Sequence, residues 1–537
     1  MKKLCSWILV LVMLFGLTAC TGTPTEDVSN TEQPVATEPG SDADSDAENV
    51  NDDKFGGTLN IAINADCTGI APWTTNGNTT DLICSWPMLE SLFTLDSEGK
   101  IVCFLAESYT TDPENLTYTI KLRDNIYFSD GSKLTAEVAK WNLELARERS
   151  KKAPNLIGEL VSVDVIDDLT IQLNLSAWNS CLPYGLAREC GYMYSKEAYD
   201  ELGEAAFEVN PVGTGPFVQT TWERDIKHEY VRNENYWGGD VYLDGVNITI
   251  YKTGLVAQAA LESGELDVWY NTDFSANQAL EEKGYVIATG SVWNTTPLLC
   301  YNSVNETEPF HDIRVRQAIS YAIDAEELMN TFYYGYGEAG NQFCVGDYYY
   351  SEDVKGYPHD VEKAKALLAE AGYPDGFDTT LTALSSQTGA VTIIKDQLAE
   401  VGINVELNIM ELSTYAVELI GWEHGMLYHP SSCTPCVPTQ LASMFCQGLS
   451  GQVLGLTSME HPDSVDEYLR ACLAAENDED QLKYLNLAQV EMIDTYCMYT
   501  PVGQAPLVFV KSPKLHDDGI NEACFYSATL STAWKEK

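Results

Sequence analysis

The chain has 537 residues, with 80 acidic and 31 basic side chains and a formal net charge of -49. This acidity argues against binding to nucleic acid, which needs basic patches, and against attraction to anionic lipid surfaces. It leaves a preference for cationic ligands open, although much of the charge serves solubility.

The first twenty residues have the pattern of an export signal. Lys2 and Lys3 precede an apolar run over 7–17, which is shorter than the about 20 residues that span a bilayer. The sequence LTAC ending at Cys20 resembles the lipobox of bacterial lipoproteins, in which the cysteine is acylated and becomes the mature N-terminus. The resemblance implies a signal peptide over 1–19 and a lipid anchor such as palmitate on Cys20. The expected location is the extracellular face of the cytoplasmic membrane, which faces the periplasm in a cell with an outer membrane.

The segment after Cys20 has the composition of a spacer. Residues 21–54 include ten acidic residues and one lysine, with almost no large apolar side chains. Such a segment cannot bury enough surface to offset the entropy lost on ordering, and its charges repel one another. Residues 20–54 are therefore predicted to be a disordered acidic tether.

Beyond the tether, strand and helix patterns alternate. Alternating apolar residues predict strands over 59–63, 118–122, 171–175 and 246–250. An apolar stripe predicts a helix over 315–323, and Asp360 is placed to cap a helix that ends at Gly372. Ser464 and Glu467 have the spacing of a capping box, and a long helix is predicted over 480–497. These patterns predict a mixed α/β protein.

Cysteine is unusually frequent for an exported protein. Removing Cys5 and Cys20 from the fifteen cysteines leaves thirteen in the mature chain. Cys433 and Cys436 form the one C-x-x-C pair, and no second pair has a zinc-like spacing. We therefore predict no metal site and no cofactor, and leave the presence of a disulfide open.

Sequence patterns of catalysis are missing. The chain contains no G-x-S-x-G, no H-E-x-x-H and no phosphate-binding loop. With 80 acidic residues a glycosidase pair cannot be dismissed by counting, but nothing singles one out. The chain is therefore predicted not to be an enzyme.

Eight strings of residues carry a family resemblance. One of them is NPVGTGPF at 210–217, and all eight follow one another along the chain in the same order as in the family. The other seven are FSDGSKLTAEV at 128–138, YWGG at 236–239, YLDGV at 242–246, SGELD at 263–267, FHDIRVRQAI at 310–319, AKALLAEAGY at 364–373 and LAEVGI at 398–403. Together they resemble the family 5 extracellular solute-binding proteins, the peptide/nickel-binding class of ABC importers. Glu137 stands where the family usually has Asp.

The resemblance implies an α/β fold of two lobes, a clamshell of the periplasmic-binding-protein type (type II-like), with an extra subdomain in the first lobe. The implied first lobe comprises 55–95, 208–303 and 506–537, the extra subdomain 96–207, and the second lobe 304–505. Most motif residues are expected to have structural roles. Gly213 and Gly215, for example, are expected to permit backbone angles or close approaches that a Cβ would forbid.

The implied function is that of a lipid-anchored receptor, monomeric and without enzymatic activity. It would capture an oligopeptide-like or other small or medium solute in a cleft between the lobes, and deliver it to an ABC permease driven by cytoplasmic ATPases. Two alternatives remain open. One is an oligosaccharide-binding receptor of the same fold, and the other is a non-transport sensor or adhesion lipoprotein.

The stretch expected to bind the ligand departs from the family pattern at one position. Peptide-binding relatives hold the ligand's amino group with an Asp shortly before an acidic residue and a proline. One alignment with these relatives sets Val437-Pro438 against the acidic residue and the proline, which leaves Cys433 or Thr434 at the position of the Asp. A second alignment puts Gly425 or Met426 at that position. Either alignment lacks the carboxylate, which argues against ordinary peptide binding, while His429 keeps nickel chelates open.

Aromatic walls and neutral hydrogen-bonding groups are expected to line the cleft. The candidate ligand-binding residues are Trp73, Trp86, Trp293, Tyr301, Trp422, Tyr428, Ser431, Ser432 and Thr434. Each tryptophan also fits a position in a hydrophobic core.

Overall fold

The computed structural model describes residues 53–96, 99–290, 294–343, 348–433, 436–449, 454–520, 528 and 530–537. The predicted signal peptide, Cys20 and all but the last two residues of the predicted tether lie outside these ranges. The described residues belong to one compact unit.

The first main sheet gathers strands from distant parts of the chain. In spatial order it contains β12 (Val286–Ala288), β19 (Val508–Lys511), β11 (Val268–Asn271), β1 (Thr58–Ile63), β10 (Gly245–Ile250), β9 (Lys227–Arg232) and β8 (Phe217–Glu223). β1 pairs parallel with β10 and β11, whereas β9 and β19 run antiparallel to their neighbours. Leu59, Ile61 and Ile63 are fully buried in the core on this sheet, and the strands predicted at 59–63 and 246–250 are confirmed.

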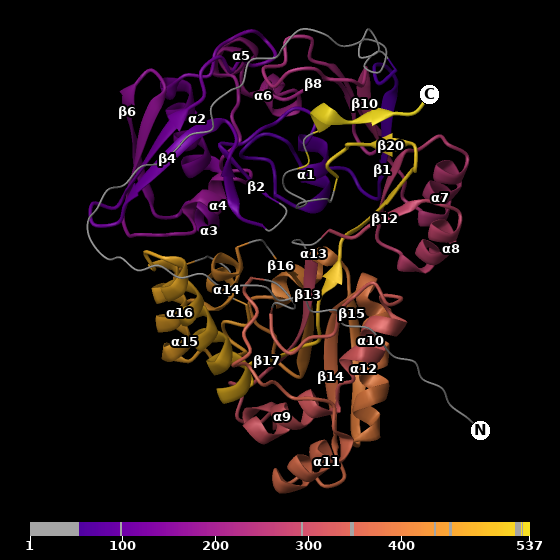
Figure 1. Ribbon diagram of the computed structural model, residues 1–537. Helices are drawn as coiled ribbons and strands as arrows, with labels where there is room; N and C mark the ends of the chain where they lie inside the picture. Colours follow the sequence, from indigo (N-terminus) through magenta and orange to yellow (C-terminus); the bar gives the residue numbers. More distant parts are fainter. Residues whose placement is uncertain are drawn as a thin grey trace, which may run out of the picture. The chain divides into compact units, whose positions relative to one another are not determined.

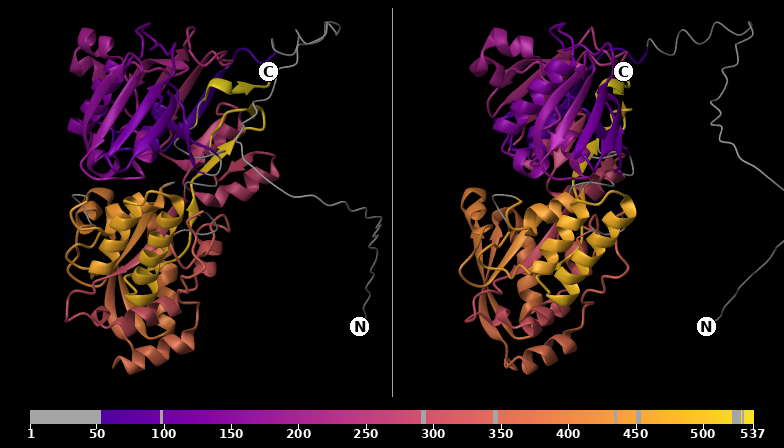
Figure 2. Two further views of the ribbon diagram at one scale, coloured as in Figure 1. Left: turned by 60° about the vertical axis from the view of Figure 1, so that its left-hand side comes forward. Right: turned by 90° about the vertical axis from the view of Figure 1, so that its left-hand side faces the viewer.

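A separate sheet of four antiparallel strands has its own core. Its order is β4 (Ala106–Asp112), β5 (Thr117–Leu122), β7 (Thr170–Leu175) and β6 (Leu160–Asp167). Its apolar face packs on α2 (Ala136–Arg149), which buries Ala139 and Leu143 in the same cluster. Figure 2 shows these purple strands side by side as one layer. The alternation predicted at 118–122 and 171–175 is confirmed.

The second main sheet is covered by helices on both faces. Its order is β15 (Ile403–Met410), β14 (Phe377–Leu384), β16 (Met426–Cys433), β13 (Asn294–Tyr301) and β17 (Tyr499–Pro501), with β18 (Ala505–Pro506) also paired to β13. Leu298 and Cys300 pack with α14 (Val437–Phe445), α15 (Asp463–Leu473) and α16 (Asp478–Val490). Leu299 and Tyr301 pack with α9 (Ile313–Ala322), α11 (Val361–Glu370) and α12 (Thr388–Glu400). Figure 1 shows α15 and α16 on one side of these strands and α12 on the other.

Shorter elements complete the fold. The helices are α1 (Thr79–Ser85), α3 (Ala153–Leu156), α4 (Leu182–Leu186), α5 (Lys196–Leu202), α6 (Glu204–Val209), α7 (Gly254–Glu262), α8 (Asn277–Glu282), α10 (Ala325–Thr331) and α13 (Leu412–Glu418). Two small hairpins pair β2 (Phe93–Leu95) with β3 (Ile101–Cys103), and β20 (Leu515–His516) with β21 (Trp534–Lys535). We call the part built on the first main sheet and the four-stranded sheet the first lobe, and the part built on the second main sheet the second lobe.

The lobe boundaries remain a prediction, but one strand differs from the predicted division. Residues up to 303 are assigned to the first lobe by the prediction, whereas β13 pairs along its whole length with β16, and over Leu298–Cys300 with β17, in the second main sheet. The apolar pattern of β13 fits a buried strand of either sheet, so the sequence could not assign it.

Helix ends agree in part with the sequence. The side chain of Asp360 caps α11 by accepting from the backbone N–H of Lys363, and Gly372 follows the helix with φ +97°, as predicted. The predicted capping box is wrong, because α15 already begins at Asp463 and Ser464 Oγ instead donates to Glu491 Oε2 at 2.9 Å. The helix predicted over 480–497 begins at Asp478 and ends at Val490, where a π-helical turn (Glu491–Thr495) follows.

A buried carboxylate links two of the family strings. Glu90 accepts hydrogen bonds from Thr214 Oγ1 at 2.8 Å, Tyr236 Oη at 2.6 Å and Trp237 Nε1 at 2.7 Å. Gly215 passes so close to the backbone of Met88 that a Cβ would lie 2.6 Å from the Met88 carbonyl carbon. These motif residues therefore hold the first lobe together.

Among the described residues, no helix combines the length and hydrophobicity needed to span a bilayer. Eight buried cysteines of the described residues form no disulfide bond. They are Cys67, Cys84, Cys181, Cys190, Cys300, Cys446, Cys472 and Cys497.

Candidate functional site

A pocket of about 340 Å³ is lined by residues from both lobes. The first lobe contributes Gly77, Asn78, Thr79, Lys152, Asn155, Leu156 and Arg188, and the second lobe contributes His429, Pro430, Ser431, Thr439, Gln440 and Ser443. Its volume lies at the small end of the range for ligand pockets, about 300–1,000 Å³. The pocket therefore suits a small solute.

The lobes touch each other beside the four-stranded sheet. The backbone N–H of Ser180 donates to the carbonyl of Leu473 at 2.8 Å, and Gln481 Nε2 donates to Ser180 Oγ at 2.9 Å. Trp178 Nε1 donates to the carbonyl of Ala475 at 3.2 Å. Main-chain and side-chain bonds thus join the lobes directly.

Two helices contribute residues to the pocket, one from each lobe. Asn78 caps α1 by accepting from the backbone N–H of Asp81 at 2.9 Å, because an amide oxygen replaces the missing helical acceptor. α14 begins at Val437 and carries Pro438 in its first turn, where the missing N–H costs nothing. The N-terminal end of a helix carries a partial positive charge. In α1 the carboxylate of Asp81 lies in the first turn and offsets this charge, and the pocket is lined by Thr439, Gln440 and Ser443 of α14 rather than by its first residue.

Two cationic side chains also line the pocket. Arg188 Nε lies 3.2 Å from Glu189 Oε2, and the Glu189 carboxylate is almost fully buried. Burial lowers the pKa of Lys152, which is half-buried at the start of α3. An anionic ligand would counteract this destabilisation of the charged lysine.

His429 is held neutral. The residue is half-buried beside the pocket, and burial lowers its pKa to about 4. Its Nδ1 lies 3.4 Å from Tyr415 Oη. At neutral pH the ring therefore offers hydrogen bonding to the pocket and carries no charge.

The family model of the bacterial extracellular solute-binding proteins, family 5 middle region, matches residues 100–434. The chain belongs to this family. The family consists of binding proteins, so the chain is a solute-binding protein and not an enzyme, as predicted.

Relatives with assigned ligands include two glutathione-binding proteins named GsiB. The one from Escherichia coli is 29% identical over 445 residues, which cover 80% of this chain and 85% of the relative. The one from Pectobacterium atrosepticum is 30% identical over 371 residues, which cover 67% and 71%.

Solved structures of similar fold include DppA from Helicobacter pylori in complex with the peptide STSA. It is 23% identical with a TM-score of 0.76, covering 90% of this chain and 99% of that protein. NikA from Brucella suis in complex with Fe(III)-EDTA is 20% identical with a TM-score of 0.76, covering 88% and 99%. The predicted two-lobed fold of the family 5 binding proteins is thereby confirmed.

A larger pocket of about 550 Å³ is confined to the second lobe. Its lining includes Asp324, Glu326, Tyr357 and His359. A ligand there would touch one lobe, whereas a family 5 ligand is expected between two. The smaller pocket is therefore the better candidate.

The nine sequence-predicted ligand residues stay predictions, and the structure places them differently. Ser431 lines the interlobe pocket, and its Oγ lies 3.2 Å from Met444 Sδ. Trp293 and Thr434 lie outside the described residues, as does the side chain of Ser432.

The remaining five lie in hydrophobic cores or against them. Trp86, Tyr301, Trp422 and Tyr428 are buried, with exposed fractions of at most 4%. Trp73 is half-buried, and Arg149 lies over its ring at 4.2 Å. None of these five lines the interlobe pocket.

The sequence did not reveal Lys152, Arg188 or the beginning of α1 as parts of the pocket. No spacing pattern connects them to residues near 430, which lie far along the chain. The stretch 425–438 was nevertheless identified as the place to look, and His429 and Ser431 from it line the pocket.

Proposed function

We propose that the chain is a lipid-anchored receptor of an ABC importer that binds a small peptide through its carboxylate groups. The solute would bind in the interlobe pocket and be delivered to a permease and its ATPases. Glutathione is the first candidate because the relatives from Escherichia coli and Pectobacterium atrosepticum are named for it. A tripeptide with two free carboxylates also matches a small pocket.

The charge of the pocket carries this proposal. Lys152 and Arg188 line it, and no Asp or Glu is among the described residues that line it. Charge-assisted hydrogen bonds to carboxylates are about twice as strong as neutral ones. The absence of the amino-binding Asp of peptide-binding relatives agrees with recognition through carboxylates rather than through the amine.

The same pocket argues against the alternatives. No Trp, Tyr or Phe is among the described residues that line it, although sugar-binding sites rely on such rings. His429 is one neutral imidazole, and a metal chelate would have only this ring among the lining residues as a nitrogen ligand. A small anionic solute is therefore favoured over an oligosaccharide or a nickel chelate.

Isothermal titration calorimetry tests the ligand class. Glutathione is expected to bind, and amidation of its glycine carboxylate is expected to weaken binding because the cationic groups lose a charged partner. Replacing Lys152→Met should weaken glutathione binding about 10- to 100-fold, since a hydrogen bond to a charged group contributes about 1.5–3 kcal/mol.

Lys151→Met is the matched control. Lys151 is exposed, bonds to Asn76 Oδ1 at 3.1 Å and does not line the pocket, so this variant should bind as the wild type does. Equal effects of the two substitutions would contradict the proposed site. Binding of a neutral oligosaccharide in place of peptides would contradict the ligand class.

The anchor and the transport role need cellular tests. Replacing Cys20→Ala should release the protein from the membrane fraction, because acylation needs the thiol. Loss of the protein should abolish uptake of the labelled ligand. Ligand binding without any change in uptake would instead favour the sensor or adhesion role.

A further inference from the structure

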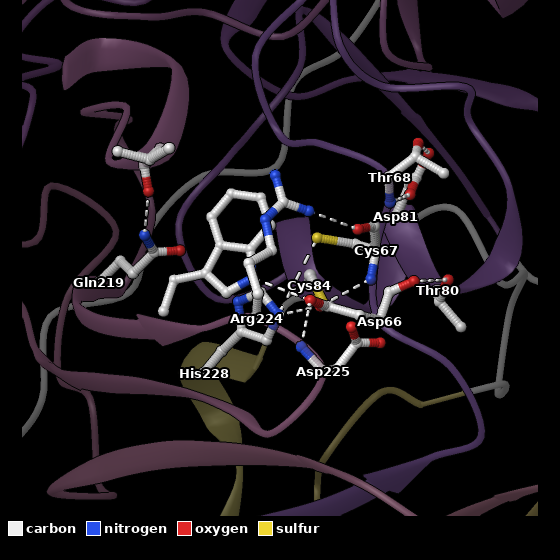
Figure 3. A network of polar contacts seen from close by, with 12 residues as sticks. Asp66, Cys67, Thr68, Thr80, Asp81, Cys84, Gln219, Arg224, Asp225 and His228 are labelled. Atoms are coloured by element: carbon white, nitrogen blue, oxygen red, sulfur yellow. Dashed lines mark hydrogen bonds and ion pairs between the residues drawn. The ribbon is translucent and has the colours of Figure 1, made fainter. Parts of the chain in front are cut away.

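Three potential metal ligands meet inside the first lobe, away from the interlobe pocket. The sulfur atoms of Cys67 and Cys84 and a ring nitrogen of His228 all lie within 4.8 Å of one another. The exposed fractions of the three residues are 2%, 0% and 0%. They come from the loop after β1, from α1 and from β9, as Figure 3 shows.

The carboxylate of Asp66 and the sulfur of Cys67 both face the Nε2 atom of His228. His228 Nε2 lies 2.8 Å from Asp66 Oδ1 and 3.9 Å from Cys67 Sγ, and both contacts are drawn in Figure 3. One proton on Nε2 can bond well to only one of these two acceptors. The ring therefore cannot satisfy both neighbours with a single proton on Nε2.

The surrounding residues hold this cluster in place. Asp66 Oδ2 accepts from Trp222 Nε1 at 3.2 Å and from the backbone N–H of Asp225 at 2.9 Å. The indole of Trp222 stacks on the His228 ring, with centroids 5.0 Å apart. Arg224 Nη1 donates to the carbonyl of Cys67 at 3.1 Å. A site built in this way is preorganised.

We propose that Cys67, Cys84 and His228 bind a thiophilic d¹⁰ cation, with Zn²⁺ as the ion that best suits two thiolates and an imidazole. With Zn–S of about 2.3 Å and Zn–N of about 2.0–2.1 Å, a tetrahedral site has an S···N edge of about 3.6 Å. The distance of 3.9 Å between Cys67 Sγ and His228 Nε2 would have to shorten by a few tenths of an ångström to reach this edge length. Asp66 lies 2.8 Å from Nε2 and is not part of this group of three, so it orients the imidazole rather than binding the ion. The three side chains leave the fourth tetrahedral position to a water molecule.

Metal binding would fix α1 to the first main sheet. Cys84 lies in the last turn of α1, whereas Asn78 and Thr79 at the other end of this helix line the interlobe pocket. The thiols lose their protons to solvent when the two Zn–S bonds form. The role of the ion is structural, and it is independent of which solute the pocket binds.

Cobalt substitution tests the site in the purified protein, reduced and freed of metal under anaerobic conditions. One equivalent of Co²⁺ is expected to give intense visible bands of a tetrahedral site and near-ultraviolet thiolate-to-cobalt charge transfer with the intensity of two thiolates. Zn²⁺ should displace the Co²⁺. A weak octahedral spectrum, or charge transfer from fewer than two thiolates, would overturn the proposal without any variant.

Variants then identify the ligands. Cys84→Ser and His228→Gln should each weaken Zn²⁺ binding at least 10-fold, measured by competition with a chromophoric chelator. Cys190→Ser removes another buried thiol, one that faces Ser150 rather than the cluster, and should leave Zn²⁺ affinity unchanged. Unchanged Zn²⁺ affinity in Cys84→Ser and His228→Gln would show that the ion binds elsewhere.

Discussion

Glu90 shows how one residue can connect the motifs of this family. Its carboxylate is buried and accepts hydrogen bonds from Thr214, Tyr236 and Trp237, which belong to two of the family strings. Burial raises the pKa of Glu90 to about 7, and the three donors act in the opposite direction. The folded protein therefore contains a buried Glu90 carboxyl group that is protonated over part of the physiological pH range.

This raised pKa predicts a pH dependence of stability. The folded protein retains the Glu90 proton up to about pH 7, whereas the unfolded chain releases it near the reference value of 4.5. The free energy of unfolding should therefore fall as pH rises through this window, by at most about 3 kcal/mol from this group. Glu90→Gln should remove this part of the slope in urea unfolding measured between pH 4.5 and 8.

Glutamine suits this test because its amide can donate to the Tyr236 hydroxyl while its oxygen still accepts from Thr214 and Trp237. Glu208→Gln, a change at a carboxylate bonded to Trp73 Nε1 at 3.2 Å, serves as the control and should keep the slope. Identical slopes for wild type and Glu90→Gln would contradict the raised pKa.

At the scale of elements, local caps decide where helices begin. α11 begins where Asp360 accepts from the backbone N–H of Lys363 at 2.9 Å, and α16 begins where Asn477 accepts from that of Asp480 at 2.9 Å. The end of α16 is different, because the backbone widens into a π-helical turn over Glu491–Thr495. Tertiary contacts there include Ser464 bonded to Glu491 and the backbone N–H groups of residues 355 and 356 bonded to Asp494.

Removing the cap of α11 should destabilise the second lobe. Asp360→Ala leaves the N–H of Lys363 without its acceptor and is expected to lower the free energy of unfolding by about 1 kcal/mol. Thermal or urea unfolding measures this loss. Asp360→Asn retains a capping oxygen and should stay within a few tenths of a kcal/mol of the wild type. A loss of equal size in both variants would show that charge, not capping, matters at this position.

For the whole molecule, charge is the dominant property. The 80 acidic residues outnumber the 31 basic residues, and compact folding brings these like charges together. Net repulsion of this kind lowers the stability of the folded state. The interlobe pocket, which is lined by Lys152 and Arg188, is a local exception on this acidic protein.

Added salt should therefore stabilise the protein. Raising NaCl from about 10 mM to about 150 mM shortens the Debye length from about 30 Å to about 8 Å and screens repulsion between distant surface charges. We expect the midpoint of thermal unfolding to rise over this range. Sucrose at matched osmolality controls for general exclusion effects, and a midpoint that falls with NaCl would mean that ion pairs outweigh repulsion.

The sequence by itself determined the family, the alternation of strands and helices, and several helix caps. These features are local, since an apolar alternation or a capping side chain acts over a few residues and can be read from neighbours in the chain. The strands at 59–63 and 171–175 and the cap at Asp360 were predicted for this reason.

Only the tertiary structure decided which sheet β13 joins, which residues line the interlobe pocket and where Cys67, Cys84 and His228 meet. The aromatic residues predicted for the cleft illustrate the difference. A tryptophan has the same sequence signature in a core as on a pocket wall, and Trp86 and Trp422 are buried in cores. Lys152 and His429, by contrast, line one pocket because the chain returns there after forming separate sheets. No local pattern encodes such a meeting, because it depends on the packing of whole lobes.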